Sequence, residues 1–537
     1  MTRARGRAVL VAATGAIALV AAHAAPALAA SSQAVADTPT LTVPASPTTP
    51  PPQHVLNALQ ATRIASASPK LQAELAKHGK TTHRAFAKGP GRWQVSWYDG
   101  GNEIGQVIVD ERQRRAVEVW TGPQAAWQMA RGLPGAFGRK VNSPFVWIPL
   151  MVAFFAAFFD WRHPFRMLHL DLLVLLSFSL SHIFFNRGEI DTSVPLVYPV
   201  LAYLLARMLW IGYARRPPPH AWRPLVPAGW LVLALIFLVG FRIGLNLTNS
   251  NVIDVGYSGV IGADRITHGD ELYGNFPSND PSGDTYGPVN YYAYIPFELA
   301  FPWSGRWDDL PAAHAAALFF DLATIATLLW LGRRLRRGQA GKALGVLLAY
   351  AWASYPYTLF VSNSNANDSL VALLVLLSFA ALAAPRARGA LLALAAAAKF
   401  APLAIAPLLA SYDRRRLRDA ALFAVALAAV TVLVYAVVLP AGGISELWNR
   451  TVGFQLGRDS PFSIWGLHPS LGWVQTVLKV AAIGFALGVA LVPRNKSPLQ
   501  LAALGAAVLI ALQITITHWF YLYIVWWFPL VMVALLL

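Results

Sequence analysis

The most regular feature of this sequence is a series of long apolar runs that begins near Ser143 and continues to the last residue. Each run approaches the ~20 residues that an α-helix needs to cross a bilayer, and short polar stretches separate the runs. The pattern predicts a polytopic α-helical membrane protein with about eleven spans. The predicted spans are residues 143–160, 168–186, 194–213, 225–246, 311–332, 342–361, 368–384, 419–439, 471–492, 498–515 and 518–537.

One further apolar segment, residues 389–410, does not fit this series. Its sequence "GALLALAAAAKFAPLAIAPLLA" is interrupted by Lys399, Pro402 and Pro407, and basic clusters flank it on both sides. A single crossing would place one of those clusters on the wrong side of the membrane. The segment therefore predicts a broken or re-entrant pair of half-helices, which is tolerated only where protein or a cavity surrounds it.

The chain before the first span has a different pattern. Residues 1–31 combine a basic start, a short apolar stretch and small residues, which predicts a secretory signal peptide, cleaved or kept as an anchor. Residues 32–53 are rich in Pro, Thr and Ser and predict a linker that does not pack. Residues 54–132 have ordinary polarity. They predict helices followed by a three-stranded meander in "RWQVSWYD", "EIGQVIVD" and "AVEVWTG".

This small α+β module, residues 54–132, resembles a PepSY-type domain. Its polar residues form no acid–base or metal-ligand constellation, so the sequence favours a spacer or docking domain without chemistry of its own. We expect the module to be dispensable for catalysis.

Composition agrees with a membrane protein and excludes several functions. The chain is 56% hydrophobic and only 13% charged. A net charge of +17 would be compatible with nucleic-acid binding, but the basic residues stand in short clusters between apolar runs, so no nucleic-acid partner is expected. The chain has no cysteine, which excludes disulfides, thiol catalysis and cysteine-based zinc sites.

The basic clusters also predict an orientation. With the N-terminal module outside, the clusters fall inside at nearly every second crossing. The loops 247–310, 362–367 and 440–470 and the turn near His518 then share the extracytoplasmic side. We expect a multi-pass plasma-membrane protein whose N-terminal domain and active site face outward.

These loops contain most of the unusual polar residues. Asp254 stands where an apolar run ends, and a carboxylate at that boundary is costly unless it reaches water or a partner. The tyrosines that follow, including Tyr286 and Tyr291, offer ring faces and hydroxyls that suit a saccharide. Asn367 and Asp368 in "SNSNANDS" are a second polar group, which helix capping explains in part. These four tyrosine, asparagine and aspartate side chains are our candidates for binding the acceptor or the sugar.

Three basic side chains are candidates for binding an anion. Arg458 lies in an outside loop, against the positive-inside trend, and an arginine there requires an anionic partner. His518 stands among aromatic residues in "THWFYLYIVWWFP", and Lys399 interrupts the re-entrant segment. Asp280 and Asp284 in "DPSGD" are poorly spaced for a divalent ion and predict a solvated turn, so no metal site is assigned, although metal dependence stays open.

The order of these motifs resembles the GT-C superfamily. The motifs are "IDVGYSGVIGADRITHGDELYG", "YGPVNYYAYIP", "NANDS", "AAAAKFAPL", "RDSPFSIWGL" and "HWFYLYIVWWFP", within residues 220–537. The arrangement is similar to the actinobacterial glycosyltransferase family 87, the polyprenol-phosphate-mannose-dependent mannosyltransferases. The resemblance implies an inverting sugar transfer, with mannose as the expected sugar, from a polyprenyl-phosphate donor to a glycolipid or glycan acceptor of the cell envelope, without a cofactor.

Residue roles follow from that resemblance. Asp254 matches the first-loop aspartate of the family, which implies a general base that acts on the acceptor hydroxyl. Arg458, Lys399 and His518 are then the candidates to stabilise the leaving polyprenyl phosphate.

Two other classes of function compete with a transferase. A transporter or flippase of lipid or polyprenyl-sugar also has broken helices and membrane-embedded polar residues, but it predicts internal repeats that this sequence does not show convincingly. A non-catalytic envelope sensor or scaffold would use the N-terminal module for binding, and it leaves the polar loop around Asp254 without a purpose.

Overall fold

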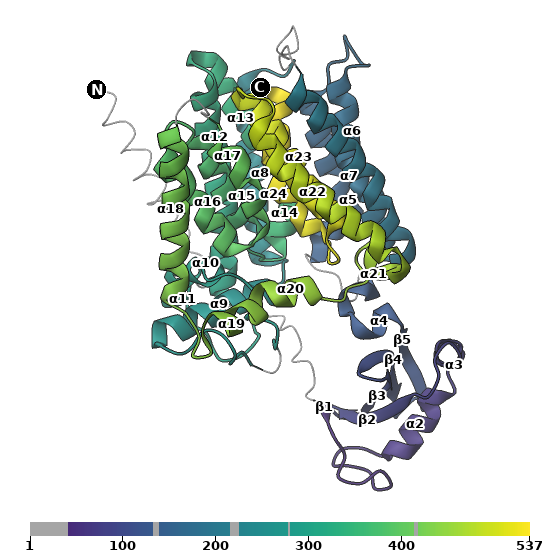
Figure 1. Ribbon diagram of the computed structural model, residues 1–537. Coiled ribbons are helices and arrows are strands. Elements are labelled where there is room, and N and C mark those ends of the chain that lie inside the picture. The colour runs from purple at the N-terminus through teal and green to yellow at the C-terminus, as the bar shows by residue number, and fades with distance from the viewer. Residues whose placement is uncertain (1–40, 133–138, 215–224, 278–279, 413–416) are drawn as a thin grey trace.

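The computed structural model describes residues 41–132, 139–214, 225–277, 280–412 and 417–537. The expected signal peptide and the first residues of the expected linker lie outside the described residues. Figure 1 shows a bundle of long helices with a small sheet domain attached at one end.

The sheet domain has five antiparallel strands rather than the three that the sequence predicted. Two helices, α2 (Ala58–Ser66) and α3 (Pro69–Leu75), pack against a sheet with the order β1-β2-β3-β4-β5. The strands are β1 (Leu41–Thr42), β2 (Thr82–Lys88), β3 (Arg92–Asp99), β4 (Asn102–Asp110) and β5 (Arg115–Thr121). Alternate residues Trp93, Val95 and Trp97 of β3 contribute to its buried core.

The expectation that residues 32–53 form an unpacked linker is wrong for the described part. Leu41 and Thr42 pair with Lys88 and Ala87 as an edge strand. Further along, the Asn57 side chain donates a hydrogen bond of 2.9 Å to the carbonyl oxygen of Thr48. The segment packs because backbone donors and acceptors of the sheet edge and of α2 are available to it.

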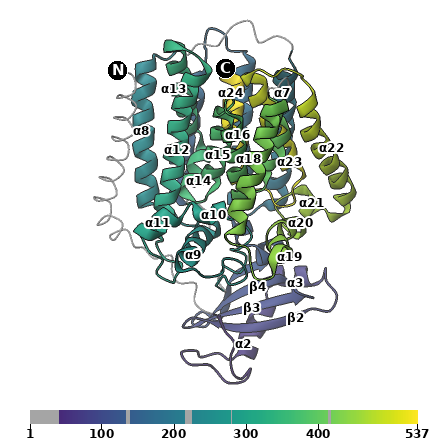
Figure 2. The ribbon, with the colours of Figure 1, turned by 60° about the vertical axis from the view of Figure 1, so that its left-hand side comes forward.

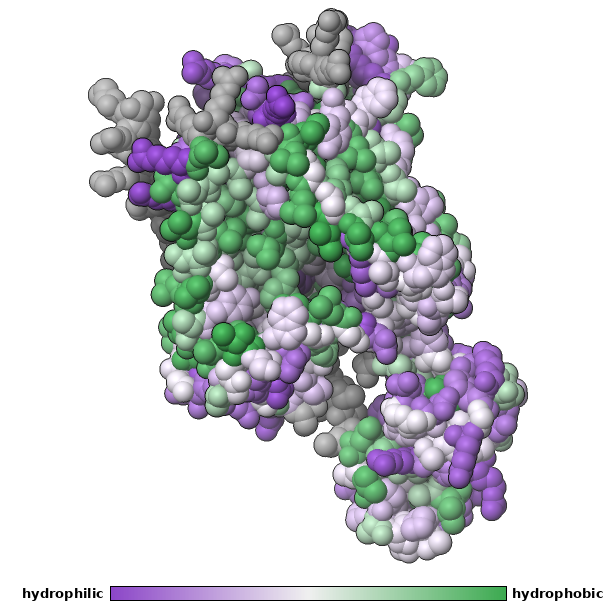
Figure 3. Space-filling view, in the orientation of Figure 1, coloured by the Kyte–Doolittle hydropathy of each residue, from purple (hydrophilic) through white to green (hydrophobic). Residues whose placement is uncertain are grey.

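Within the described ranges, seven helices of the bundle are long and apolar enough to cross a membrane, by length and composition. These seven spans are α6 (Met167–Asn186), α7 (Ile190–Tyr213), α8 (Ala228–Thr248), α12 (Pro311–Leu335), α18 (Leu417–Ala436), the stretch Pro469–Leu491 that contains α22 (Gly472–Leu491), and α23 (Pro498–Thr515). The structure is thus that of a polytopic helical membrane protein, as expected. Figure 3 shows hydrophobic side chains along the flank of the bundle and hydrophilic ones over much of the sheet domain.

The other four predicted spans are short or bent helices. They are α5 (Pro144–Phe158), α13 (Gly338–Ser354) with α14 (Pro356–Asn363), α15 (Asp368–Ala380), and α24 (Ile524–Leu536). The chain bends by 60° between α13 and α14, at Pro356, which lacks the N–H that would continue the first helix. Helices that stop inside the bundle bring polar chain ends into its interior, where surrounding protein can satisfy them.

The segment 389–410 turns back on itself. The helix α16 (Pro385–Ala398) ends at Lys399, and the return is made by η4 (Ala401–Ile405) and α17 (Ala406–Ala410). The reversal brings the Arg388 guanidinium to 5.7 Å from the ring centre of Tyr412. The chain path therefore has the fold-back that the two prolines and the lysine predicted, with both ends of the segment at the same end of the bundle.

The loops that the sequence grouped together gather at the opposite end, next to the sheet domain (Figures 1 and 2). Short helices form much of this region. They are α9 (Asp254–His268), α10 (Val289–Tyr292), α11 (Ile295–Ala300), α19 (Gly443–Trp448), α20 (Phe454–Gly457) and α21 (Ile464–Leu467).

Candidate active site

Asp254 is positioned by the turn between α14 and α15. The backbone N–H groups of Asn251 and Ile253 donate to the carbonyl oxygens of Asn363 and Ser364, at 3.2 Å each. Asn365, with φ of 49°, adds a side-chain bond of 2.9 Å to the Asn251 carbonyl. The chain before Asp254 is thus tied to the "SNSNANDS" motif, whose main observed role is to hold the first residue of α9.

The Asp254 side chain opens into a cavity, while residues 255–263 behind it are buried. Its Oδ1 accepts a hydrogen bond of 2.9 Å from the Val255 N–H. Although Asp254 is exposed to the cavity, the surrounding protein partly desolvates its carboxyl group and raises its pKa above the ordinary value, against the opposing effects of that N–H, Arg458 and Lys399. A carboxylate with a raised pKa is a stronger base than one in water.

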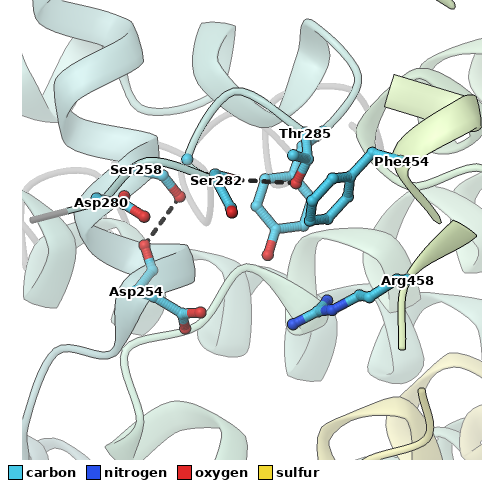
Figure 4. A pocket seen from close by; sticks show the side chains of 9 residues that line it. Asp254, Ser258, Asp280, Ser282, Thr285, Phe454 and Arg458 are labelled. Carbon is cyan, nitrogen blue, oxygen red and sulfur yellow. Dashed lines mark hydrogen bonds between the residues drawn. The ribbon is translucent and has the colours of Figure 1, made fainter. Parts of the chain in front are cut away.

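The cavity beside Asp254 is small, about 20 Å³, which is room for one water or one hydroxyl group. Asp254, Asp280 and Arg458 all line it, together with serine and threonine side chains (Figure 4). In this view the Asp254 carboxylate and the Arg458 guanidinium face each other across the open space.

The expectation of a solvated turn at "DPSGD" is wrong. Asp280 and Asp284 are only 6% and 2% exposed. Asp284 accepts a bond of 2.7 Å from the Gly274 N–H and pairs with Arg450 at 3.0 Å, so it is a structural residue. Asp280 lines the cavity, and its Oδ2 has no hydrogen-bond partner among the described residues. Burial, then the nearby charges of Asp254 and Asp284, raise the pKa of Asp280 to about 7.

Arg458 forms no ion pair or hydrogen bond with another side chain in the part of the chain that the structure describes, although it is half-buried. Its guanidinium carbon lies 5.2 Å from the ring centre of Trp127 and 5.8 Å from that of Phe454. An arginine that is held by rings and turned toward a cavity is available to an anion.

Lys399 and Asp368 form an ion pair of 2.6 Å where α16 ends and α15 begins. The same Asp368 oxygen accepts a bond of 2.8 Å from the indole N–H of Trp526, while its second oxygen has no partner among the described residues. The Lys399 ammonium also lies within 5.7 Å of the ring centres of Tyr286, Tyr523 and Trp526. Asp368 thus belongs with the candidate phosphate-binding lysine, rather than in the small cavity beside Asp254.

A second, larger cavity of about 460 Å³ also has Arg458 in its wall. Its polar lining includes the three candidate anion-binding residues, Lys399, Arg458 and His518, together with Gln455, Lys479 and Thr517, and the rest is largely apolar. Leu403, Leu456 and Ile516 are examples of that apolar wall. Arg458 and Tyr286 line both cavities, so the two spaces meet at these side chains.

His518 is a neutral member of this group. Its Nδ1 lies 2.8 Å from the hydroxyl of Ser460, and burial, together with the charges of Arg458 and Lys399, lowers its pKa well below the ordinary value. It can contribute a hydrogen bond to an anion but no positive charge.

Three of the four expected saccharide-binding residues, Tyr291, Asn367 and Asp368, line neither cavity, and only Tyr286 does. Tyr291 is fully buried, and its hydroxyl donates a bond of 2.7 Å to the carbonyl oxygen of Gly283. Asn367 is also fully buried, and neither of its amide atoms has a partner among the described residues. No cluster of three or more His, Cys, Asp or Glu side chains that would hold a metal occurs in the described ranges.

Several residues of the site were not selected from the sequence. Trp526 and Tyr523 are in the aromatic motif around His518, whose composition resembled a membrane-interface belt. Asp280 was set aside because a turn sequence does not reveal burial. Trp127 comes from the sheet domain, and no local pattern connects it to residues more than three hundred positions away.

Comparison with known proteins adds no relative: no protein-family model matches this chain, and no curated protein matches it.

Proposed function

We propose that this protein is a membrane glycosyltransferase of the GT-C type. It transfers a sugar, mannose by its resemblance to family 87, from a polyprenyl phosphate to an envelope acceptor, with inversion. The proposal rests on the observation that two cavities share lining side chains. A small cavity with the Asp254 carboxylate meets a large cavity with cationic and apolar walls at Arg458 and Tyr286.

The two cavities fit the two substrates of such a reaction. A polyprenyl phosphate is an apolar chain that ends in an anion, and the larger cavity combines apolar side chains with Lys399 and Arg458. The smaller cavity takes one acceptor hydroxyl next to Asp254. The anomeric carbon of the donor would then lie at the junction, between the base and the cations.

The chemistry follows from these positions. Asp254 removes the proton from the acceptor hydroxyl while the hydroxyl oxygen forms a bond to the anomeric carbon. The bond between that carbon and the phosphate oxygen breaks, and its electron pair goes to the phosphate. Arg458 and Lys399 stabilise the growing negative charge, and the neutral His518 donates a hydrogen bond. Asp280, with its pKa near 7, is a second polar contact for the acceptor hydroxyl.

Transfer of label from a polyprenyl-phosphate sugar to an envelope acceptor tests this function. We expect membranes that contain the wild-type protein to transfer label, and Asp254→Asn to lower turnover by about 10²-fold or more, because the amide cannot accept the proton. Binding of the donor lipid should change little.

The matched control is Asp270→Asn, because Asp270 is an exposed carboxylate that follows the same helix, α9. It should keep near wild-type turnover at equal expression. Asp284 is unsuitable as a control because it is buried and paired with Arg450. Near wild-type transfer by Asp254→Asn would end the assignment of the base, and absence of transfer by the wild type with donors of several sugars would end the proposed function.

A further inference from the structure

The sheet domain reaches the candidate active site through one side chain. Trp127 stands between α4 (Pro123–Ala126) and the short helix η1 (Gln128–Arg131). Figure 1 shows α4 at the end of the sheet domain that faces the bundle. Its ring centre lies 5.2 Å from the Arg458 guanidinium carbon, 5.6 Å from the ring centre of Phe462 and 5.7 Å from that of His518. Two of these three neighbours, Arg458 and His518, line the larger cavity.

Trp127 lines neither cavity itself. Its ring packs against the Arg458 guanidinium. The ring of Phe454 packs against the same guanidinium, with its centre 5.8 Å from the guanidinium carbon. A guanidinium on a long side chain loses rotamer freedom when it binds an anion, and rings that already hold it reduce that cost. Because Arg458 forms no ion pair among the described residues, these rings are the contacts that define its position.

The sheet domain packs closely against the helix bundle through backbone contacts. A Cβ atom on Gly132 would come within 2.6 Å of the Asn186 carbonyl oxygen and 2.7 Å of the Gly188 nitrogen. The side-chain amide of Gln124 donates a bond of 3.1 Å to the Gly188 carbonyl. Two glycines with positive φ, Gly132 at 78° and Gly188 at 76°, make this approach of the two chains possible.

We propose that Trp127 is a positioning residue for the donor phosphate and that the sheet domain, through it, is part of the transfer apparatus. The inference rests on the proposed function for the identity of the anion. It departs from the expectation that residues 54–132 are a dispensable spacer. The ligand class is a polyprenyl phosphate, whose phosphate meets Arg458, and Trp127 acts through that guanidinium without touching the lipid.

The test measures binding of decaprenyl phosphate to the full-length protein, and transfer kinetics beside it. Trp127→Ala should raise the Kd for decaprenyl phosphate, and the KM for the donor, roughly ten-fold, which is the range of a partly buried cation–π contact. Trp127→Phe keeps a ring and should restore most of the affinity. The control is Trp161→Ala, because Trp161 makes a similar contact with Arg162, at 5.4 Å, and is 68% exposed. It should change neither constant.

A double variant separates positioning from a general structural effect. In an Arg458→Gln background, Trp127→Ala should cause little further loss, because the guanidinium it positions is gone. An equal loss with and without Arg458, or an unchanged Kd in Trp127→Ala, would overturn the proposal.

Binding also distinguishes this inference from the proposed function. If the wild type binds decaprenyl phosphate in a Trp127-dependent way but transfers no sugar, the transferase is wrong and the positioning role stands. If the wild type binds no decaprenyl phosphate, the positioning role is wrong.

Discussion

Two arginine–aspartate arrangements in this bundle differ in how completely each charge is satisfied. Between α8 and α12, Arg242 and Asp321 are fully buried and joined by two bonds of 2.8 and 2.5 Å. The indole N–H of Trp352 donates to the same carboxylate at 2.8 Å. At the candidate active site, Asp254 and Arg458 face each other across a cavity, and no ion pair joins them.

The difference distinguishes charged residues that stabilise the fold from charged residues that are available to bind a ligand. A buried pair that is fully hydrogen-bonded has little free energy to offer another molecule, because its desolvation is already compensated. A carboxylate and a guanidinium that line open space keep that capacity. Residue type alone does not distinguish the two sites. The number of side-chain nitrogen and oxygen atoms that have a hydrogen-bond or ion-pair partner does.

Removing one member of the closed pair should have the largest effect on stability. We expect Arg242→Leu to lower the free energy of unfolding by about 3–5 kcal/mol, because it leaves the Asp321 charge buried without its partner. The double variant Arg242→Met/Asp321→Leu is the control and should recover most of this loss. Thermal unfolding in detergent measures both, and a fully tolerated Arg242→Leu would show that the pair is not structural.

At the candidate active site, removing the arginine should change ligand affinity rather than stability. We expect Arg458→Gln to leave thermal stability almost unchanged, since no described acid loses a partner, while the affinity for decaprenyl phosphate falls about 10–100-fold with the loss of a charge-assisted contact. Titration of the lipid against both proteins measures the change. A strong loss of stability without a loss of affinity would move Arg458 into the structural class.

Asp280 should affect stability in a way that depends on pH and that disappears in acid. Because its pKa is raised from 3.8 to about 7, the folded chain holds this proton more tightly than the unfolded chain does. Its contribution to stability is therefore fully present below about pH 4 and is lost as the pH rises through about 7. Asp280→Asn should match the wild type near pH 4 and melt at a higher temperature near pH 8. An equal difference in Tm at both pH values would contradict the raised pKa.

The long helices were predictable from the sequence because lipid imposes a strict condition on chain composition. The span expected at 311–332 is Pro311–Leu335, and that expected at 471–492 contains Gly472–Leu491. The reversal at Lys399 also had a local signal, since prolines and a lysine interrupt an apolar run.

The remaining features depend on contacts between distant segments. The strand Thr82–Lys88 was missed because "THRAFAK" alternates weakly and is recognised only through its pairing with β3. The sequence "DPSGD" has the same composition whether it is solvated or buried, and here Gly283 packs against Phe276. Asp254 and Arg458 were both selected from the sequence, but their placement on one cavity requires the folded loops.

The shortness of α15 would set the depth of the proposed transfer reaction. Its 13 residues rise only ~20 Å, against a hydrocarbon layer of ~30 Å, so this helix is too short to cross the layer by itself. Asp368 begins this helix, and Lys399 caps the C-terminus of the neighbouring α16, which has 14 residues. A lipid-linked sugar would thus be received below the level of the headgroups, in a water-poor layer. Spontaneous hydrolysis of the activated donor would be slow there until an acceptor arrives.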